Sequence, residues 1–131
     1  MAEHPNAALI QRGYAAFAAG DMATLDALFS DRIVWTVAGR SPLGGTYTGK
    51  ADVFGKFMAG LGERSGGTLS IEIETVVADD DHVVVIARHT SSHAGRSLDV
   101  RNIDVYTVRD GQVTEARSTS FDPYENDAFY A

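Results

Sequence analysis

The chain has 131 residues, of which 44% are hydrophobic and 22% are charged. These values are typical of a folded globular protein, and the length is that of one domain, so we treat residues 1–131 as a single domain. Eighteen acidic and eleven basic residues give a net charge of −7, which repels phosphate backbones and argues against a nucleic-acid partner.

The sequence contains no cysteine, which excludes disulfides, thiol nucleophiles and cysteine-ligated metal centres. Residues 1–6 contain no basic segment followed by an apolar one, and no run of eighteen apolar residues occurs anywhere. We therefore expect a cytoplasmic protein that is neither exported nor inserted in a membrane.

Helical periodicity dominates the first half of the chain. Residues 7–19 predict an amphipathic helix capped by Asn6, and residues 22–29 predict a second one after the Gly20–Asp21 stop. The β-branched and aromatic run 33–37 predicts a short strand. The glycine-rich stretch 39–49 predicts a long loop, and residues 50–61 predict a third helix with one apolar stripe.

The second half has the two-residue period of strands. Strands are expected at 68–77, 82–92, 97–109 and 112–121, joined by short turns at 79–81, 94–96 and 110–111. The tail from Asp122 is acidic and aromatic. No parallel βαβ unit is apparent, so the pattern predicts an α+β fold in which three N-terminal helices pack on a strongly curved antiparallel sheet.

Helices on one face leave the opposite face of the sheet uncovered. Alternate residues such as Ile103 and Val105 make that face apolar enough to pack on a second copy, so we expect a homodimer.

Four segments occur in an order that resembles a known family: GYAAFAAGDMATLDALFSD, VWTVAGRSPLGGTYTGKADV, NIDVYTVRDGQVTEARS and FDPYENDAFYA. The chain is similar to SnoaL-like, ketosteroid-isomerase-like members of the nuclear transport factor two superfamily over residues 6–130. The resemblance implies a conical α+β barrel that encloses a pocket. That superfamily includes isomerases, polyketide cyclases, epoxide hydrolases, dehydratases and non-catalytic binders.

Asp104 is the most informative candidate residue. It lies mid-strand between Ile103 and Val105, where a carboxylate must be paired, solvated in a cavity or protonated. The resemblance to ketosteroid isomerases implies a neutral acid that donates to an oxyanion, an effect for which the enzyme itself is the standard example. The alternative is a structural carboxylate bound to a backbone group, to Arg101 or to Arg117. The resemblance also places Tyr14 at the oxyanion tyrosine, although a tyrosine at such a helix position is more often a core residue.

Strand alternation puts Asn102, Asp104 and Tyr106 on one face and directs Ser118, Ser120 and Asp122 of the next strand to the same space. Asn102 is a hydrogen-bond donor to a substrate oxygen or to Asp104. Asp122 is either an acid/base partner or the cap of a C-terminal turn.

The sequence departs from two of the activities that the resemblance suggests. Residues 36–39 carry no carboxylate where the isomerases have their general base. Epoxide hydrolases of this fold use an Arg-x-Asp pair with a second Asp, whereas this chain has Asn102-x-Asp104 with Asp122 and lacks the arginine.

Large apolar side chains suited to a flat ligand are the candidate substrate-binding residues, together with the serines named above: Trp35, Phe54, Phe57, Met58 and Tyr106. His89 is a candidate base near neutral pH, or a structural histidine. The other histidines are not spaced as ligands, so no metal site is predicted, and no cofactor motif is present.

These observations favour a cofactor-independent acid/base enzyme of the isomerase, cyclase or lyase type, acting on a small apolar carbonyl compound, with polycyclic compounds included. Asp104 is the central acid, assisted by Tyr14, Asn102 and Asp122. The alternatives are a non-catalytic binder of small apolar molecules, an epoxide-hydrolase-like enzyme, and a dimerisation module whose cone is filled by side chains.

Overall fold

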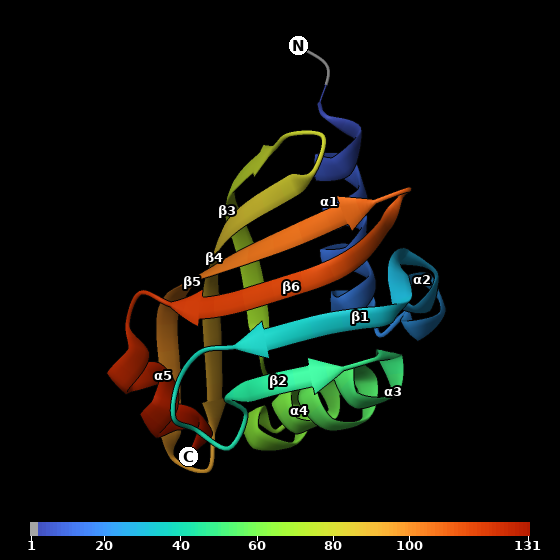
Figure 1. The fold of residues 1–131 in the computed structure, drawn as a ribbon. Helices are drawn as coiled ribbons and strands as arrows, with labels where there is room; N and C mark the ends of the chain where they lie inside the picture. Colours follow the sequence, from blue (N-terminus) through green and yellow to red (C-terminus); the bar gives the residue numbers. More distant parts are fainter. Residues whose placement is uncertain (1–2) are drawn as a thin grey trace.

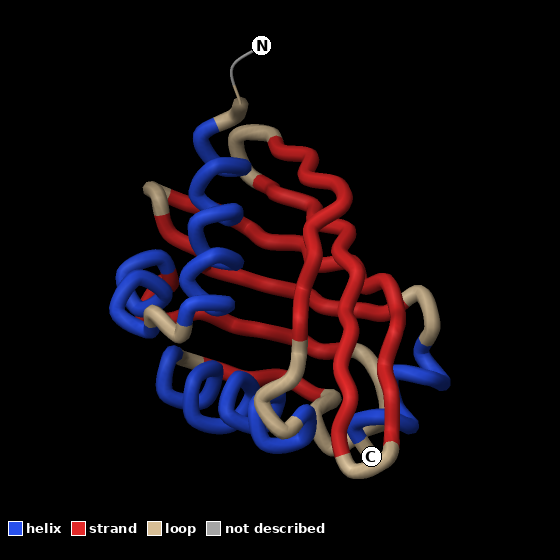
Figure 2. The backbone as a smooth tube through the Cα atoms, turned by 180° about the vertical axis from the view of Figure 1, so that it is seen from behind, coloured by secondary structure: helices blue, strands red, loops and turns tan. Residues whose placement is uncertain are grey.

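The structure is a computed structural model that describes residues 3–131, and helices lie against one face of a curved sheet (Figures 1 and 2). The elements in chain order are α1 (Pro5–Ala19), α2 (Met22–Leu28), β1 (Phe29–Val37), β2 (Gly45–Thr48), α3 (Lys50–Asp52), η1 (Val53–Met58), α4 (Ala59–Ser65), β3 (Ser70–Ala78), β4 (His82–His93), β5 (Arg96–Arg109), β6 (Gln112–Ser120) and α5 (Pro123–Tyr130). The predicted α+β class, with its N-terminal helices on a curved sheet, is confirmed.

The six strands form one sheet in the order β2-β1-β6-β5-β4-β3. All neighbours are antiparallel except β1 and β6, which run parallel, so the expected antiparallel sheet is in fact mixed. The strand pattern did not reveal this because β1 and β6 are far apart in the chain, and no tight turn fixes their relative direction. The sheet remains open at β2 and β3, as expected of a cone.

Two strand assignments in the first half need correction. The predicted loop 39–49 contains β2, in which Thr46, Tyr47 and Thr48 pair with β1. The glycines of this stretch predicted a loop, although its threonines and tyrosine favour a strand. Strand β1 begins at Phe29, which pairs with Val113, and a register shift follows before Val34.

The third predicted helix is longer than expected, because helical structure continues from Lys50 to Ser65 with the π-helix η1 in its middle. It ends at Gly66, whose φ of 62° is the left-handed conformation that glycine adopts most easily. The acidic, aromatic tail forms a further helix, α5, with Pro123 in its first turn.

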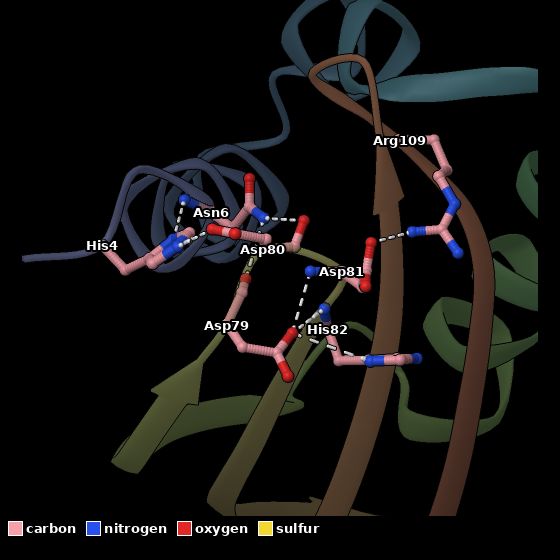
Figure 3. A network of polar contacts seen from close by, with 7 residues as sticks. All are labelled: His4, Asn6, Asp79, Asp80, Asp81, His82 and Arg109. Atoms are coloured by element: carbon pink, nitrogen blue, oxygen red, sulfur yellow. Dashed lines mark hydrogen bonds and ion pairs between the residues drawn. The ribbon is translucent and has the colours of Figure 1, made fainter.

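Helix α1 is fixed to the β3–β4 turn by the polar network in Figure 3. The predicted cap Asn6 is wrong: His4 Nδ1 accepts a hydrogen bond from the Asn6 backbone N–H at 3.1 Å. The Asn6 side chain instead donates to the carbonyls of Asp79 and Asp80, and His4 Nε2 lies 3.1 Å from Asp80 Oδ1. These contacts hold α1 across β3 and β4 and so set the position of Tyr14.

The apolar interior has two parts. The larger lies between the helices and the inner face of the sheet, with Ile33, Val53 and Val85 fully buried. The smaller one, which we call the α5 cluster, consists of Leu43, Leu98, Val100, Phe129 and Tyr130. Within residues 3–131, no helix is both long and apolar enough to cross a membrane.

Candidate functional site

A cavity of about 110 Å³ lies between the helices and the inner face of the sheet. Its wall is mostly apolar, with Leu9, Ile10 and Phe17 on α1, Phe57 and Met58 on η1, and Trp35 on β1. The polar side chains that reach it come from α1, the sheet, the 38–44 loop and α5: Tyr14, Ser41, His89, Asn102, Asp104, Tyr106, Ser118, Asn126 and Tyr130.

Three hydroxyl and carboxyl groups form one hydrogen-bonded cluster in this wall. Tyr14 donates to Asp104 Oδ2 at 2.5 Å, and its oxygen lies 2.7 Å from the Tyr106 hydroxyl. Asp104 and Tyr106 are two residues apart on β5, so the pleat directs both inward, and they are only 6% and 5% exposed. We call these residues the Tyr14–Asp104–Tyr106 cluster.

Both tyrosines of the cluster hold their protons strongly. Burial is the main cause that raises the pKa of Tyr14 well above its usual value, and neighbouring Tyr106 and Asp104 raise it further. Burial and then Asp104 raise the pKa of Tyr106 in the same way. At neutral pH both tyrosines therefore keep their hydroxyl protons within an apolar enclosure, where a hydrogen bond is electrostatically stronger than in water.

His89 and Asn102 form a second polar pair on the same face of the sheet. Asn102 Nδ2 lies 3.4 Å from His89 Nδ1, while His89 Nε2 and Asn102 Oδ1 are buried with no hydrogen-bond partner among the described residues. Burial lowers the pKa of His89, and the nearby Asp104 opposes this only in part. The imidazole is therefore neutral at pH 7 and able to accept a proton.

Trp35 closes one side of the cavity beside the cluster. Its Nε1 donates to Ser118 Oγ at 2.9 Å, which fixes the plane of the indole. The ring centroids of Tyr106 and Phe57 lie 5.7 and 5.2 Å from that of Trp35. These contacts make a rigid aromatic wall from three separate elements.

A family model for the SnoaL-like domain matches residues 10–116. The chain belongs to the SnoaL-like domain family. An uncharacterised protein of Mycobacterium tuberculosis is 31% identical over the full length of both chains. The structure of Bal32a, from a soil-derived mobile gene cassette, is 35% identical with a TM-score of 0.91 over 96% of each chain. A Jannaschia protein proposed to be a SnoaL-like polyketide cyclase is 22% identical, with a TM-score of 0.82 over 100% of this chain and 98% of its own.

Most of the predicted site residues of this SnoaL-like chain meet at the cavity. Tyr14, Asn102, Asp104 and Tyr106 line it, as do Trp35, Phe57, Met58 and Ser118. The suggested structural partners of Asp104 are engaged elsewhere, since Arg101 pairs with Glu74 and Arg117 with Glu115. The carboxyl group of Asp104 is instead bound by a tyrosine that sequence reasoning had weighed as a core residue.

Three predicted site residues lie outside the cavity wall. Phe54 stacks on Phe29 with ring centroids 5.6 Å apart, so it packs in the core. Ser120 ends β6 and accepts a hydrogen bond from the Asp122 backbone N–H. Asp122 is exposed, and its side chain makes no capping bond to α5. It does not face the cavity because β6 ends at Ser120, so the strand alternation does not extend to it.

Within the described part of the chain, the cavity therefore lacks the Arg-x-Asp pair and second Asp that epoxide hydrolases of this fold use. Asp122 is on the surface, and no arginine of residues 3–131 lines the cavity. Nor do the described residues hold any group of three His, Asp or Glu side chains arranged to bind a metal ion.

Sequence reasoning missed two cavity residues of α5, Asn126 and Tyr130. The sequence did carry a signal for them. Pro123 favours the start of a helix, and Asn126 and Tyr130 are four residues apart, which places them on one face of that helix. The spacing does not say that this face turns toward the cavity.

Proposed function

We propose that this SnoaL-like protein is a cofactor-independent acid/base enzyme that acts on an apolar carbonyl compound. The observation that carries the proposal is the Tyr14–Asp104–Tyr106 cluster in an otherwise apolar cavity. Preorganised O–H donors in a water-poor site stabilise the oxyanion that forms when a carbonyl compound loses a neighbouring proton.

The reaction needs a proton acceptor as well as oxyanion donors. In the proposed step, a C–H bond next to the carbonyl breaks, its proton passes to Nε2 of neutral His89, and the electron pair moves to the carbonyl oxygen held by the cluster. Nε2 is free to accept the proton when the Asn102 amide turns its Oδ1, in place of Nδ2, toward a protonated Nδ1. Return of the proton to another carbon gives an isomer. Attack of the enolate carbon on a second carbonyl closes a ring, and the new alkoxide takes the proton back from His89. Both outcomes balance without an oxidant or cofactor.

Each member of the site has a distinct proposed role. Tyr14 and the carboxylic acid form of Asp104 donate hydrogen bonds to the carbonyl oxygen, which replaces their mutual bond, and Tyr106 supports Tyr14. Asn102 is a positioning residue, because the orientation of its amide selects which nitrogen of His89 carries the proton. The isomerases have their base on the loop after the first strand, so His89 would supply the proton acceptor from a different element.

Exchange of carbon-bound protons tests the proposal. 2-Tetralone in heavy water exchanges the protons beside its carbonyl slowly, and proton NMR follows the added rate due to the protein. We expect Asp104→Asn to lower that added rate by about 10²- to 10⁴-fold, the usual contribution of a positioned acid or base. Asp122→Asn is the matched control and leaves the rate unchanged, because Asp122 is exposed outside the cavity.

A wild-type rate equal to the solvent background would contradict the enzyme proposal. One observation favours the alternative of a binding protein: the Tyr14 hydroxyl is hydrogen-bonded to the Asp104 carboxyl group, which engages the proposed acid within the protein. A binder would hold 2-tetralone with an affinity that Asp104→Asn does not change, and it would not speed exchange.

A further inference from the structure

Two buried polar atoms of α5 have no role in the chemistry described above. Asn126 Oδ1 and the Tyr130 hydroxyl are buried without a hydrogen-bond partner among the described residues, and both side chains line the cavity. Tyr130 is only 3% exposed. An unpaired polar atom in a protein interior is costly, so two of them at one place indicate a group that is meant to be bound there.

The two residues share one face of the helix. They are spaced i and i+4 on α5, which places their side chains next to each other. A tyrosine hydroxyl is both donor and acceptor, and the amide oxygen is an acceptor. A ligand hydroxyl matches the pair, because it accepts from Tyr130 and donates to Asn126 Oδ1.

Helix α5 is held in place at both ends of this pair. The Asp127 carboxylate accepts hydrogen bonds from the backbone N–H groups of Arg40, at 3.0 and 3.1 Å, and of Ser41, at 3.2 Å. Arg64 Nη1 donates to the carbonyl oxygen of Tyr130 at 3.0 Å. The close approach of the loop to Asp127 leaves no room for a Cβ at Gly39, which would lie 2.6 Å from Asp127 Oδ1. The pair is thus a fixed feature of the wall.

The pair lies well away from the oxyanion donors. Tyr130 packs in the α5 cluster with Leu98 and Val100, and Val100 precedes Asp104 by four residues on β5. Four residues of strand span about 13 Å, and the curvature of the sheet shortens the path through the cavity to on the order of 10 Å. His89 pairs with Val100 and contacts Asn102, two residues before Asp104 on β5.

We propose that Asn126 and Tyr130 form a second polar subsite that binds a hydroxyl at the far end of the ligand. The proposal rests on the proposed function for the first end, where the Tyr14–Asp104–Tyr106 cluster takes an oxygen. Together the two ends define the ligand class: an elongated apolar body, two or more rings long, with an oxygen substituent at each end.

Binding of two matched phenols tests this subsite without any need for turnover. 4-Hydroxybiphenyl has one polar end and 4,4′-dihydroxybiphenyl has two, and calorimetric titration measures both affinities. We expect the dihydroxy compound to bind the wild-type protein at least about 5-fold more tightly, the gain of one net hydrogen bond. In Tyr130→Phe this preference falls to less than 2-fold while the affinity for 4-hydroxybiphenyl stays the same.

Equal affinities in the wild type, a preference that persists in Tyr130→Phe, or no binding of either phenol would overturn the second subsite. The first end is tested separately by Asp104→Asn, which weakens both phenols alike if the cluster takes an oxygen. If the wild type does not speed proton exchange but still prefers the dihydroxy compound, the proposed chemistry is wrong and the second subsite is supported. If it speeds exchange but binds both phenols equally, the second subsite is wrong and the proposed chemistry is supported.

Discussion

The Tyr14 hydroxyl of helix α1 donates a hydrogen bond to Asp104 Oδ2 of strand β5 at 2.5 Å. The two residues are ninety positions apart in the chain, so this bond ties the first helix to the centre of the sheet. It also determines that the carboxyl group faces the cavity with one oxygen already bound.

Tyr14→Phe removes the donor and leaves a buried carboxyl oxygen unpaired. We expect the free energy of unfolding to fall by about 1–3 kcal/mol, measured by urea denaturation. Tyr124→Phe is the control, because Tyr124 is 90% exposed and its change leaves stability within about 0.5 kcal/mol. Equal stability of Tyr14→Phe and the wild type would show that the bond contributes nothing.

His89 gives the protein a pH dependence of stability. Burial lowers the pKa of His89 in the folded protein below its unfolded value, so between these two pKa values the unfolded chain binds more protons. The contribution of His89 to the free energy of unfolding is therefore fully present above about pH 6.5, the ordinary histidine pKa, and is lost as the pH falls below it. Asp104 faces His89 in the cavity and opposes the lowering of the His89 pKa, which weakens the effect.

Urea denaturation at pH 5 and pH 8 measures this difference, which we expect to shrink in His89→Gln. His93→Gln is the control, because His93 lies exposed at the end of β4 and outside the cavity. An unchanged difference between the two pH values in His89→Gln would mean that other groups cause it.

Replacement of tyrosine by phenylalanine is expected to have opposite effects on stability at Tyr47 and Tyr130. Tyr47 donates to the Leu43 carbonyl at 2.7 Å, so Tyr47→Phe removes a made bond and is expected to cost about 1 kcal/mol. The Tyr130 hydroxyl has no partner among the described residues, and burial raises its pKa to about 12. Tyr130→Phe is therefore expected to leave the unliganded protein as stable as before or more stable, by up to about 1–2 kcal/mol.

Thermal denaturation of the two variants side by side is the measurement. A marked loss of stability in Tyr130→Phe would show that its hydroxyl is paired within the fold, and would also weaken the case for the second subsite.

The homodimer remains a proposal for the outer face of the sheet. Val84 pairs with Val105 and Ile86 with Ile103 there, and these half-buried side chains form a continuous apolar area opposite the helices. We expect sedimentation velocity to show a dimer in the wild type and a monomer in Ile103→Arg, because the interface cannot bury an unpaired charge. Met22→Arg, at an exposed position on helix α2 away from this face, is the control that leaves the mass unchanged. A wild-type monomer at all concentrations would contradict the proposal.

Much of the fold is predictable because it depends on local periodicity. The alternation in β5 placed Asn102, Asp104 and Tyr106 on one face, and the structure shows all three at the cavity. The same rule failed at Asp122, since alternation holds only within a strand and β6 ends at Ser120. The parallel pairing of β1 with β6 was not predicted, because it joins strands about eighty residues apart that no short turn connects.

The sequence by itself determined the α+β class, the family and the inward carboxyl group, since each follows from residue order and spacing along the chain. Only the tertiary structure decided that Tyr14 reaches Asp104, that His89 faces the cavity with Nε2 unpaired, and that α5 turns Asn126 and Tyr130 toward the same space. The physical reason is that these relationships join side chains of different elements. Their distances are set by how helices are packed and tethered on a twisted sheet, which periodicity along one element does not encode.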